Sequence, residues 1–295
     1  MKIGIDLRGT KTEGILIDNT GKELIRKRIK TKKNYQETIN GITLIVNDFE
    51  KDFGKVSSVG IGMPGAVTAE TALIKNANSI WLNGKPLKKD LEKELDRSIN
   101  LENDANCFTL SEAVDGAGKG KKIIFGVIIG TGVGGGIVVN QKILTGINSI
   151  AGEWGHNALP NRNKEEVKYV NKCYCTHEGC METYISGPGF ASCYNLRHNT
   201  NLNSHEIVTR YPEENKSKKA LIQYVDHLAR GLSNVVNILD PDIIVLGGGM
   251  SNIDFIYDTI NDQLKKYVFT DTCHTKVVKN IHGDSSGVRG AAWLG

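Results

Sequence analysis

The sequence predicts an α/β protein built from a duplicated unit. Each half of the chain begins with two apolar strands joined by a glycine-containing turn, in residues 3–18 and again in residues 125–140. After each pair, amphipathic helical segments alternate with short buried strands, which is the pattern of α/β domains. Because the two hairpins stand at matching places in separate halves, we expect two related α/β domains.

The composition is that of a globular protein. Of 295 residues, 39% are hydrophobic and 24% are charged, which suffices for two domains with a large buried core. The formal net charge of +4 arises mainly in residues 22–33 and 216–219, and it is too small to indicate nucleic-acid binding. Asp6 interrupts the start where a secretory signal would be apolar, and no apolar run reaches membrane-spanning length. We therefore expect a cytoplasmic protein with no nucleic-acid or membrane partner.

The first domain is predicted to span residues 1–117. Strands are expected in residues 3–6, 14–18 and 22–31, and the spacing of apolar residues over 35–53 predicts an amphipathic helix. A buried strand follows at 59–63. Pro86 is expected in the first turn of a helix that carries Leu87, Leu91 and Leu95 on one face. The glycine-rich, charged segment 116–120 is expected to end the domain.

The second domain is predicted to span residues 118–285. After its hairpin, a long amphipathic helix is expected over residues 218–239, ending before Pro241. A buried strand at 242–246 runs into three glycines, and a helix is expected over 253–267. A short strand near 277–278 and a loop over 283–287 precede a last helix, residues 286–295, which we expect to pack on the first domain.

Asp104 is the central candidate for chemistry. It stands between Asn103 and Asn106, where an extended segment gives way to a predicted helix over 105–114. An aspartate at such a junction often caps the helix. The alternative is that Asp104 is the general base of a sugar kinase, accepting a proton from the hydroxyl that receives the phosphoryl group.

The glycine-rich turns predict phosphate binding. The spacing of Gly130, Gly132 and Gly135 formally fits the dinucleotide fingerprint, but strand residues follow where that fingerprint needs a helix. No Walker A loop is present either, since no Gly-Lys pair precedes Ser or Thr. Two matching turns instead favour backbone N–H groups that approach phosphate oxygens. Ordinary tight hairpins remain the alternative.

The first turn adds a carboxylate to this pattern. Asp6 ends a strand, and Thr10 and Lys11 follow it. A carboxylate there can hold Mg²⁺ through water while Thr10 and the backbone bind phosphate oxygens. Positioning and cations on the phosphate oxygens are most of what phosphoryl transfer requires.

Three cysteines and a histidine predict a metal centre. Cys173, Cys175 and Cys180, with His156 upstream, make a closed tetrahedral zinc set. With all four positions taken by protein, the zinc would be structural and would fold residues 153–184, which contain few apolar side chains. Three unlinked buried cysteines are the alternative.

Several segments together resemble the ROK family of bacterial sugar kinases and repressors, over essentially the whole chain. They are Asp6-Leu7-Arg8-Gly9-Thr10-Lys11-Thr12-Glu13, Lys75-Asn76-Ala77-Asn78-Ser79, Asn103-Asp104-Ala105-Asn106, Glu153-Trp154-Gly155-His156 and residues 173–182. Within the family the chain looks most similar to fructokinases of the manno(fructo)kinase type, through residues 78–84, 237–241 and 282–293.

The resemblance implies an actin-like ATPase (ribonuclease H-like) fold of two α/β domains with a deep cleft between them. It implies transfer of the γ-phosphate of ATP to the 6-hydroxyl of a hexose, with D-fructose expected and mannose or glucose as alternatives. Zn²⁺ is implied as a structural cofactor and Mg²⁺ as the companion of ATP. A homodimer is also implied.

The resemblance also implies residue roles. Asp104 would be the catalytic base and would touch the sugar together with Asn78, Asn103, Glu153, His156 and Glu182. His156, Cys173, Cys175 and Cys180 would bind zinc, and Asp6 would hold magnesium through water. The ATP site would comprise Asp6, Gly9, Thr10, Lys11, Gly130, Thr131, Gly132, Gly134, Gly247, Gly248 and Gly249.

Two residues depart from the family pattern. Arg8 stands where the first turn normally has a glycine, and it could crowd the phosphate or add a cation. Thr176 stands where the zinc segment normally has a glycine, so a positive φ there would be strained. A sugar-binding protein impaired in catalysis is therefore an alternative function. Against a repressor, the first strand begins at Ile3, ahead of which we expect no DNA-binding segment. An actin-like assembly protein would have no use for the zinc set.

Overall fold

The computed structural model describes residues 1–295 and forms two compact units. Unit 1 comprises Met1–Gly120, Gly136–Ala151 and Ile281–Gly295, and unit 2 comprises Lys121–Gly135 and Gly152–Asn280. The predicted domain limits differ from these units chiefly in residues 136–151. This segment belongs with unit 1 because Gly136 lies directly against Ala105 and Thr109 of the helix that begins at Asp104.

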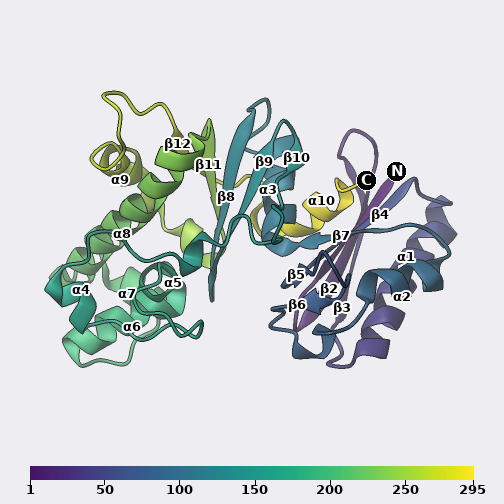
Figure 1. The fold of residues 1–295 in the computed structure, drawn as a ribbon, viewed down its shortest axis with the longest axis horizontal. Helices are drawn as coiled ribbons and strands as arrows, with labels where there is room; N and C mark the ends of the chain where they lie inside the picture. The colour runs from purple at the N-terminus through teal and green to yellow at the C-terminus, as the bar shows by residue number, and fades with distance from the viewer. The chain divides into compact units, whose positions relative to one another are not determined.

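Unit 1 is built on a five-stranded sheet. Its strands are β1 (Lys2–Leu7), β2 (Lys11–Ile17), β3 (Glu23–Lys30), β4 (Ser58–Met63) and β7 (Asn100–Asn103), in the order β3-β2-β1-β4-β7. Strand β1 pairs antiparallel with β2 and parallel with β4. Its helices are α1 (Tyr35–Phe53), α2 (Leu87–Leu95), α3 (Asp104–Val114) and α10 (Ser286–Ala292). Short strands β5 (Ala66–Val67) and β6 (Ile74–Lys75) pair with each other (Figure 1).

Successive side chains of a strand point to opposite faces of the sheet, so the two faces of this sheet carry different residues and pack against different helices. Ile3, Ile5 and Leu7 point into a core shared with the apolar stripes of α1 and α2. On the other face, Gly4 and Gly60 lie against the backbone of α10, where a Cβ would come within 2.2 Å and 1.9 Å of carbonyl oxygens. Glycine in these strands therefore lets α10 approach the sheet closely.

Buried acidic side chains fix α3 and α10 to each other. Glu112 of α3 is fully buried and accepts hydrogen bonds from Ser286 Oγ (2.8 Å) and from the backbone N–H of Ala117 (2.9 Å). Asp115, which follows α3, pairs with Arg289 and His282. Asp104 thus stands at the N-terminus of a helix that is anchored along its length.

The second sheet repeats the order of the first, as β10-β9-β8-β11-β12. Its strands are β8 (Ile123–Ile129), β9 (Val133–Val139), β10 (Lys142–Ile143), β11 (Ile243–Gly247) and β12 (Lys276–Lys279). Strand β11 pairs parallel with both β8 and β12. The repeated order confirms the predicted duplication of an α/β unit.

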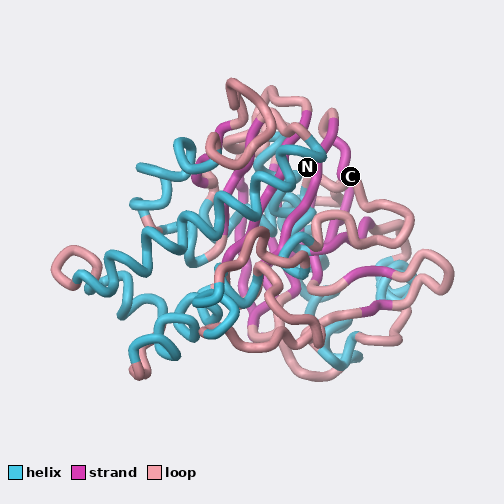
Figure 2. Tube along the Cα trace, turned by 60° about the vertical axis from the view of Figure 1, so that its left-hand side comes forward, coloured by secondary structure: helices cyan, strands magenta, loops and turns pink.

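Helices make up most of the rest of unit 2 (Figure 2). They are α4 (Lys164–Lys168), α5 (Glu182–Ile185), α6 (Gly187–His198), α7 (Ser204–Arg210), α8 (Asn215–Leu239) and α9 (Asp254–Leu264). The long helix α8 packs against α9 and α7 (Figure 1). Helices α8 and α9 were predicted, whereas α4, α6 and α7 were not, because they are short or lack a strong apolar stripe.

Local corrections concern helix ends. Pro86 is the N-cap of α2 and not part of its first turn. Residues 283–285 form a 3-10 turn within the predicted loop, and α10 starts at Ser286.

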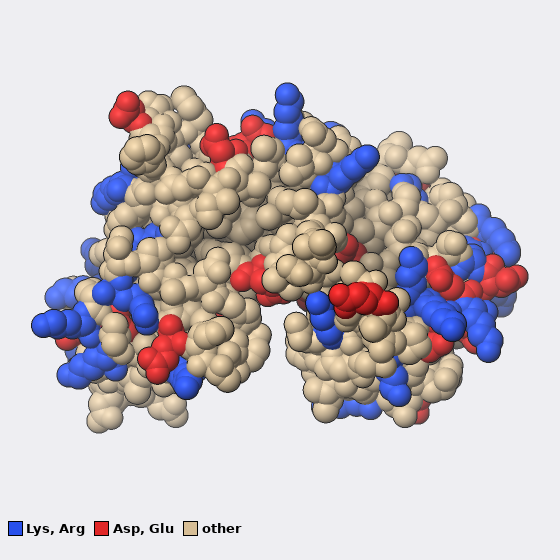
Figure 3. All heavy atoms as spheres, viewed as in Figure 1, with Lys and Arg blue, Asp and Glu red and all other residues tan.

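The surface carries charges of both signs. Figure 3 shows basic and acidic side chains interspersed over one face. None of the helices combines the length and the apolar character needed to cross a membrane.

Candidate active site and metal centre

Asp104 does not cap helix α3, because Asn103 does. The Asn103 Oδ1 accepts hydrogen bonds from the backbone N–H groups of Ala105 (2.9 Å) and Asn106 (3.4 Å). The Asn103 Nδ2 donates to the carbonyl oxygen of Gly65 at 2.9 Å. Asp104 accepts one of these N–H groups as well, from Ala105 at 2.9 Å, together with its own backbone N–H, and no side chain donates to its half-buried carboxylate. It is therefore available to a ligand.

The surroundings of Asp104 tune its proton affinity. Burial, followed by the negative charge of Asp6, raises the pKa of Asp104 to about 6. Arg8 opposes that shift. A carboxylate whose pKa lies near neutral pH is suited to take up and release a proton during turnover.

Asp6 and Arg8 form an ion pair at the end of β1. The Arg8 Nε donates to Asp6 Oδ2 at 2.6 Å, and Arg8 Nη2 donates to the backbone oxygen of Asp284 at 3.2 Å. Asp6 is almost completely buried, with 2% of its surface exposed. Burial raises the pKa of Asp6, and the Arg8 charge works against that effect.

Gly287 lies close beside Asp6. A Cβ at this position would lie 3.2 Å from Asp6 Oδ2 and 3.9 Å from Arg8, so any larger residue would press on the ion pair. A carboxylate is a hard oxygen donor of the kind that Mg²⁺ prefers, so the donor type of Asp6 fits the predicted role.

A further polar group, which the sequence did not single out, lies beside the turn after Asp6. The Ser79 Oγ is buried, has no hydrogen-bond partner in the protein and lies 3.5 Å from where a Cβ of Gly9 would be. A buried hydroxyl without a partner indicates a place for a ligand or water. Thr10 is exposed at the tip of this turn, and Lys11 begins β2.

Asn78 lies exposed in the loop before the 3-10 turn Ile80–Leu82. The Asn83 side chain holds this loop by accepting from Ala77 N–H and donating to Ala77 O, both at 2.9 Å. Asn83 is thus a positioning residue for Asn78, which periodicity could not reveal.

In unit 2, Glu182 braces the glycine turn between β8 and β9. Its Oε2 accepts from the backbone N–H of Val133 at 2.9 Å and lies 2.8 Å from where a Cβ of Gly132 would be. A side chain at position 132 would therefore displace Glu182. Of the turn's backbone N–H groups, that of Gly130 is also used internally, by Gly132 O. Gly134 O accepts from Trp154 Nε1 at 3.1 Å. Part of the predicted phosphate turn is therefore satisfied by the protein itself.

A pocket of about 750 Å³ opens beside this turn. Gly130, Thr131 and Gly249 line it, as predicted phosphate or adenine residues. Gly247 and Gly248 do not: Gly247 ends β11, and Gly248 has φ +83° with Ile129 O 2.5 Å from where a Cβ would be. Glycine at 248 is thus required by the backbone.

The other walls of this pocket come from helices that the sequence did not assign to the site. They are Gly187, Pro188, Ser204, His205, Val208, Thr209, Met250, Asn252 and Ile253. One signal could have found helix α7: Asn203 and Glu206 form a capping box at its start.

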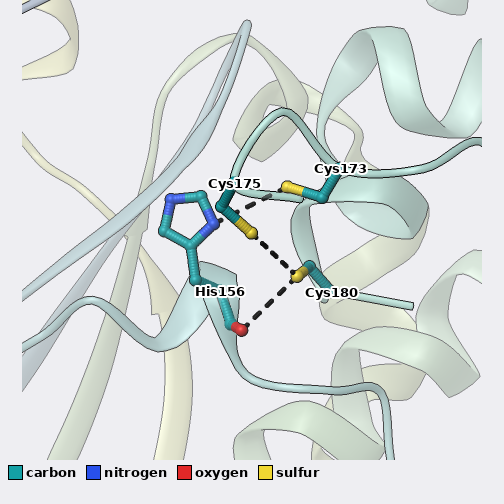
Figure 4. Close-up of side chains that lie close together, drawn as sticks. All are labelled: His156, Cys173, Cys175 and Cys180. Carbon is teal, nitrogen blue, oxygen red and sulfur yellow. Dashed lines mark hydrogen bonds between the residues drawn. The ribbon is translucent and has the colours of Figure 1, made fainter. Parts of the chain in front are cut away.

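The predicted zinc ligands lie together (Figure 4). The ligand atoms of His156, Cys173, Cys175 and Cys180 are all within 4.8 Å of one another. The Cys175 and Cys180 sulfurs are 3.5 Å apart, and Cys173 Sγ is 3.7 Å from His156 Nδ1. A tetrahedral zinc with ordinary Zn–S and Zn–N bonds has ligand atoms roughly 3.5–3.8 Å apart. The four residues therefore fit a metal ion of this kind.

Neighbouring groups shift the cysteines of this cluster in opposite directions. The backbone N–H of His177 lowers the pKa of Cys175 to about 6, whereas burial raises the pKa of Cys173 and that of Cys180. The other ring nitrogen of His156, Nε2, lies 3.0 Å from Tyr174 Oη. That contact orients the ring so that Nδ1 faces the cysteines. Glu153, predicted at the sugar site, is exposed just before the 3-10 turn that carries His156.

Thr176 has φ +74°, as its replacement of a glycine predicted. A β-branched side chain is strained in this region. We expect Thr176→Gly to raise the free energy of unfolding by about 1 kcal/mol, measured by thermal or urea denaturation of the metal-loaded protein.

Asn161→Gly is the matched control for this change. Asn161 also has a positive φ, of 50°, but asparagine tolerates this conformation, so its replacement should stabilise the protein less. Equal effects of the two variants would show that Thr176 is not strained.

Comparisons with known proteins agree with this geometry. The sequence model of the ROK family matches residues 2–295. The N-acetyl-D-glucosamine kinases of Salmonella typhimurium and Escherichia coli are each 37% identical over 299 residues, covering 100% of this chain and 99% of theirs. The ROK hexokinase of Thermus thermophilus superposes with a TM-score of 0.87 at 25% identity, covering 100% of this chain and 97% of the other. A ROK family glucokinase from Streptomyces griseus, solved with glucose and AMPPNP, gives 0.79 at 25% identity, over 99% and 98%.

Proposed function

Because this chain belongs to the ROK family, we propose that it is an ATP-dependent kinase that phosphorylates the 6-hydroxyl of a hexose. The observation that carries the proposal is the state of Asp104. Asn103, and not Asp104, is the N-cap of α3. The pKa of Asp104 is about 6, and the charges of Asp6 and Arg8 at the first turn act on it.

In this proposal, Asp104 accepts the proton of the sugar hydroxyl as the phosphoryl group arrives. Asn78, held in its loop by Asn83, and Asn103 contribute polar groups to the sugar site. Because the Asn103 side chain already makes three hydrogen bonds, its contact with sugar would use its remaining N–H. Asp6 would hold Mg²⁺, which neutralises charge on the phosphates, while Gly9, Thr10 and Lys11 bind their oxygens.

Unit 2 would bind the nucleotide and organise the sugar side. The pocket lined by Gly130, Thr131 and Gly249 has room for an adenosine, and no Asp, Glu, Lys or Arg is among its lining residues. Glu153, His156 and Glu182 would contact the sugar. One oxygen of Glu182 is taken by Val133 N–H, so the other would serve the ligand.

We propose zinc for the cluster of His156 and the three cysteines, in a structural role. Four protein ligands leave no open position for substrate or water. Residues 153–184 would depend on the metal for their fold.

The sugar is the part of the proposal that needs an assay. The segments 78–84, 237–241 and 282–293 favour D-fructose, whereas the 37% identical relatives act on N-acetyl-D-glucosamine by name. We propose D-fructose first and N-acetyl-D-glucosamine as the second candidate.

The test is kcat/KM with ATP and Mg²⁺ for D-fructose, D-mannose, D-glucose and N-acetyl-D-glucosamine. We expect kcat/KM for D-fructose to exceed that for each other sugar by at least about tenfold. One or two polar contacts made only with the preferred sugar can produce a ratio of this size. A higher value for N-acetyl-D-glucosamine would reject fructose but keep the kinase. Binding of sugar without turnover of any of the four would reject the kinase in favour of a sugar-binding protein. Sedimentation velocity would test the homodimer that we also propose.

A further inference from the structure

Arg8 gives the first turn a cation of its own. Its guanidinium donates two hydrogen bonds. Nε donates to Asp6 Oδ2 at 2.6 Å, and Nη2 donates to the backbone oxygen of Asp284 at 3.2 Å. A short hydrogen bond between two charged groups is among the stronger side-chain contacts. The sequence left open whether Arg8 points outward or toward the phosphate site, and the structure directs it to Asp6.

The need for that cation follows from burial. Asp6 has 2% of its surface exposed, and a buried carboxylate is costly unless a positive group accompanies it. Asp104, which is half-buried, adds a second negative charge nearby, and the charge of Asp6 helps to raise the pKa of Asp104. In the absence of ligands, Arg8 supplies the compensating charge for both carboxylates.

The same carboxylate is the one that would hold Mg²⁺. Asp6 Oδ2 already carries the Arg8 guanidinium at 2.6 Å. A dication held by the same carboxylate would lie next to this guanidinium, and the two positive charges would repel each other. Arg8 and the metal are therefore alternatives at Asp6, and Arg8, with 37% of its side chain exposed, has room to move away from Asp6 when the metal binds.

We propose that Arg8 is a resident cation that takes the place of Mg²⁺ at Asp6 and so weakens the dependence of nucleotide binding on the metal. This inference rests on the proposed function. Without metal, Arg8 stays on Asp6, and its positive charge at the first turn supports binding of the phosphates. With metal, Arg8 has to leave Asp6, so part of the gain from the metal is lost. Both effects reduce the factor by which Mg²⁺ strengthens nucleotide binding.

The test is a double cycle of metal and Arg8. The Kd of AMPPNP is measured by calorimetry in excess Mg²⁺ and in excess EDTA, for the wild-type protein and for Arg8→Gly. The ratio of the two Kd values is the coupling between metal and nucleotide. We expect this ratio to rise roughly tenfold in Arg8→Gly, the size of one charge-assisted hydrogen bond. The expected rise in this ratio does not depend on whether the variant binds AMPPNP more tightly or more weakly than the wild type.

Two further variants keep the result interpretable. Arg8→Gln keeps the length of the side chain without its charge and should raise the ratio in the same way, even if glycine disturbs the turn. Lys55→Gly removes one positive charge from an exposed loop of the same unit and should leave the ratio unchanged.

An unchanged or smaller ratio in both Arg8 variants would overturn the inference and leave the kinase proposal intact. A ratio that rises equally in Lys55→Gly would also overturn it, since net charge alone would then be responsible. If the wild-type protein binds no AMPPNP under either condition, this inference and the proposed function fall together.

Discussion

Asp104→Asn is expected to lower kcat roughly 10²- to 10⁴-fold with ATP and the preferred sugar, the contribution typical of a general base. The amide cannot accept the hydroxyl proton, yet it has nearly the same shape. Because Asn103 caps α3, the helix should keep its stability, and the sugar Kd should change little. Coupled-assay kinetics, calorimetry with sugar and a thermal melt measure these three quantities.

Asp96→Asn is the control for this variant. Asp96 is exposed at the end of α2 in the left-handed conformation, which asparagine tolerates, so full activity is expected. Near-normal turnover by Asp104→Asn would refute the catalytic role. A large loss of thermal stability would instead show that Asp104 supports the fold.

The pH dependence of kcat/KM provides an independent view of the same residue. The pKa of Asp104 is raised to about 6, first by burial and then by Asp6, so the protonated and inactive form predominates below that pH. Activity should therefore rise with pH through about 6, falling about tenfold for each unit below it. Absence of an acid limb near this pH would mean that no group with this pKa has to be deprotonated.

Loss of the metal is expected to unfold part of unit 2. Zinc held by three thiolates and an imidazole contributes free energy on the order of 10 kcal/mol, and it would link His156 to the irregular segment that carries the three cysteines. Cys175→Ser should therefore contain no zinc, be cut by protease within this segment and lose activity. Mass spectrometry of metal content should give about one equivalent per chain in the wild type.

Cys273→Ser is the matched control, because Cys273 lies outside the cluster and its thiol makes one long hydrogen bond, to Thr275 O at 3.9 Å. It should keep both its zinc and its activity. A Cys175→Ser protein that stays resistant to protease without metal would contradict the structural role of zinc.

Much of the fold was readable from the sequence. The apolar period of α1 and the run of buried residues in β11 are local signals, and their predicted positions are confirmed to within a few residues. The two-domain actin-like ATPase fold expected from the ROK resemblance is confirmed by the superposition with ROK hexokinase. Helices α4 and α7 were not predicted. Each is short and begins with a capping box, and neither is long enough to show an apolar period.

The candidate site was predicted as a set of residue types and not as a set of contacts. The sequence singled out Asp104 and the four residues of the cysteine–histidine cluster, because cysteines two and five residues apart already restrict where their sulfurs can lie. It could not decide whether Asp104 caps its helix, since aspartate and asparagine cap equally well.

The sequence by itself determined the α/β duplication, the family and the grouping of His156 with the three cysteines, because these depend on periodicity, motifs and short spacing. The tertiary structure decided that Asn103 caps α3, that Glu182 braces the turn at Val133 and that Arg8 pairs with Asp6. The direction of a polar side chain depends on which donors and acceptors the packed elements bring near it. Those neighbours are often distant in the chain, as Val133 is from Glu182, so no local pattern encodes the contact.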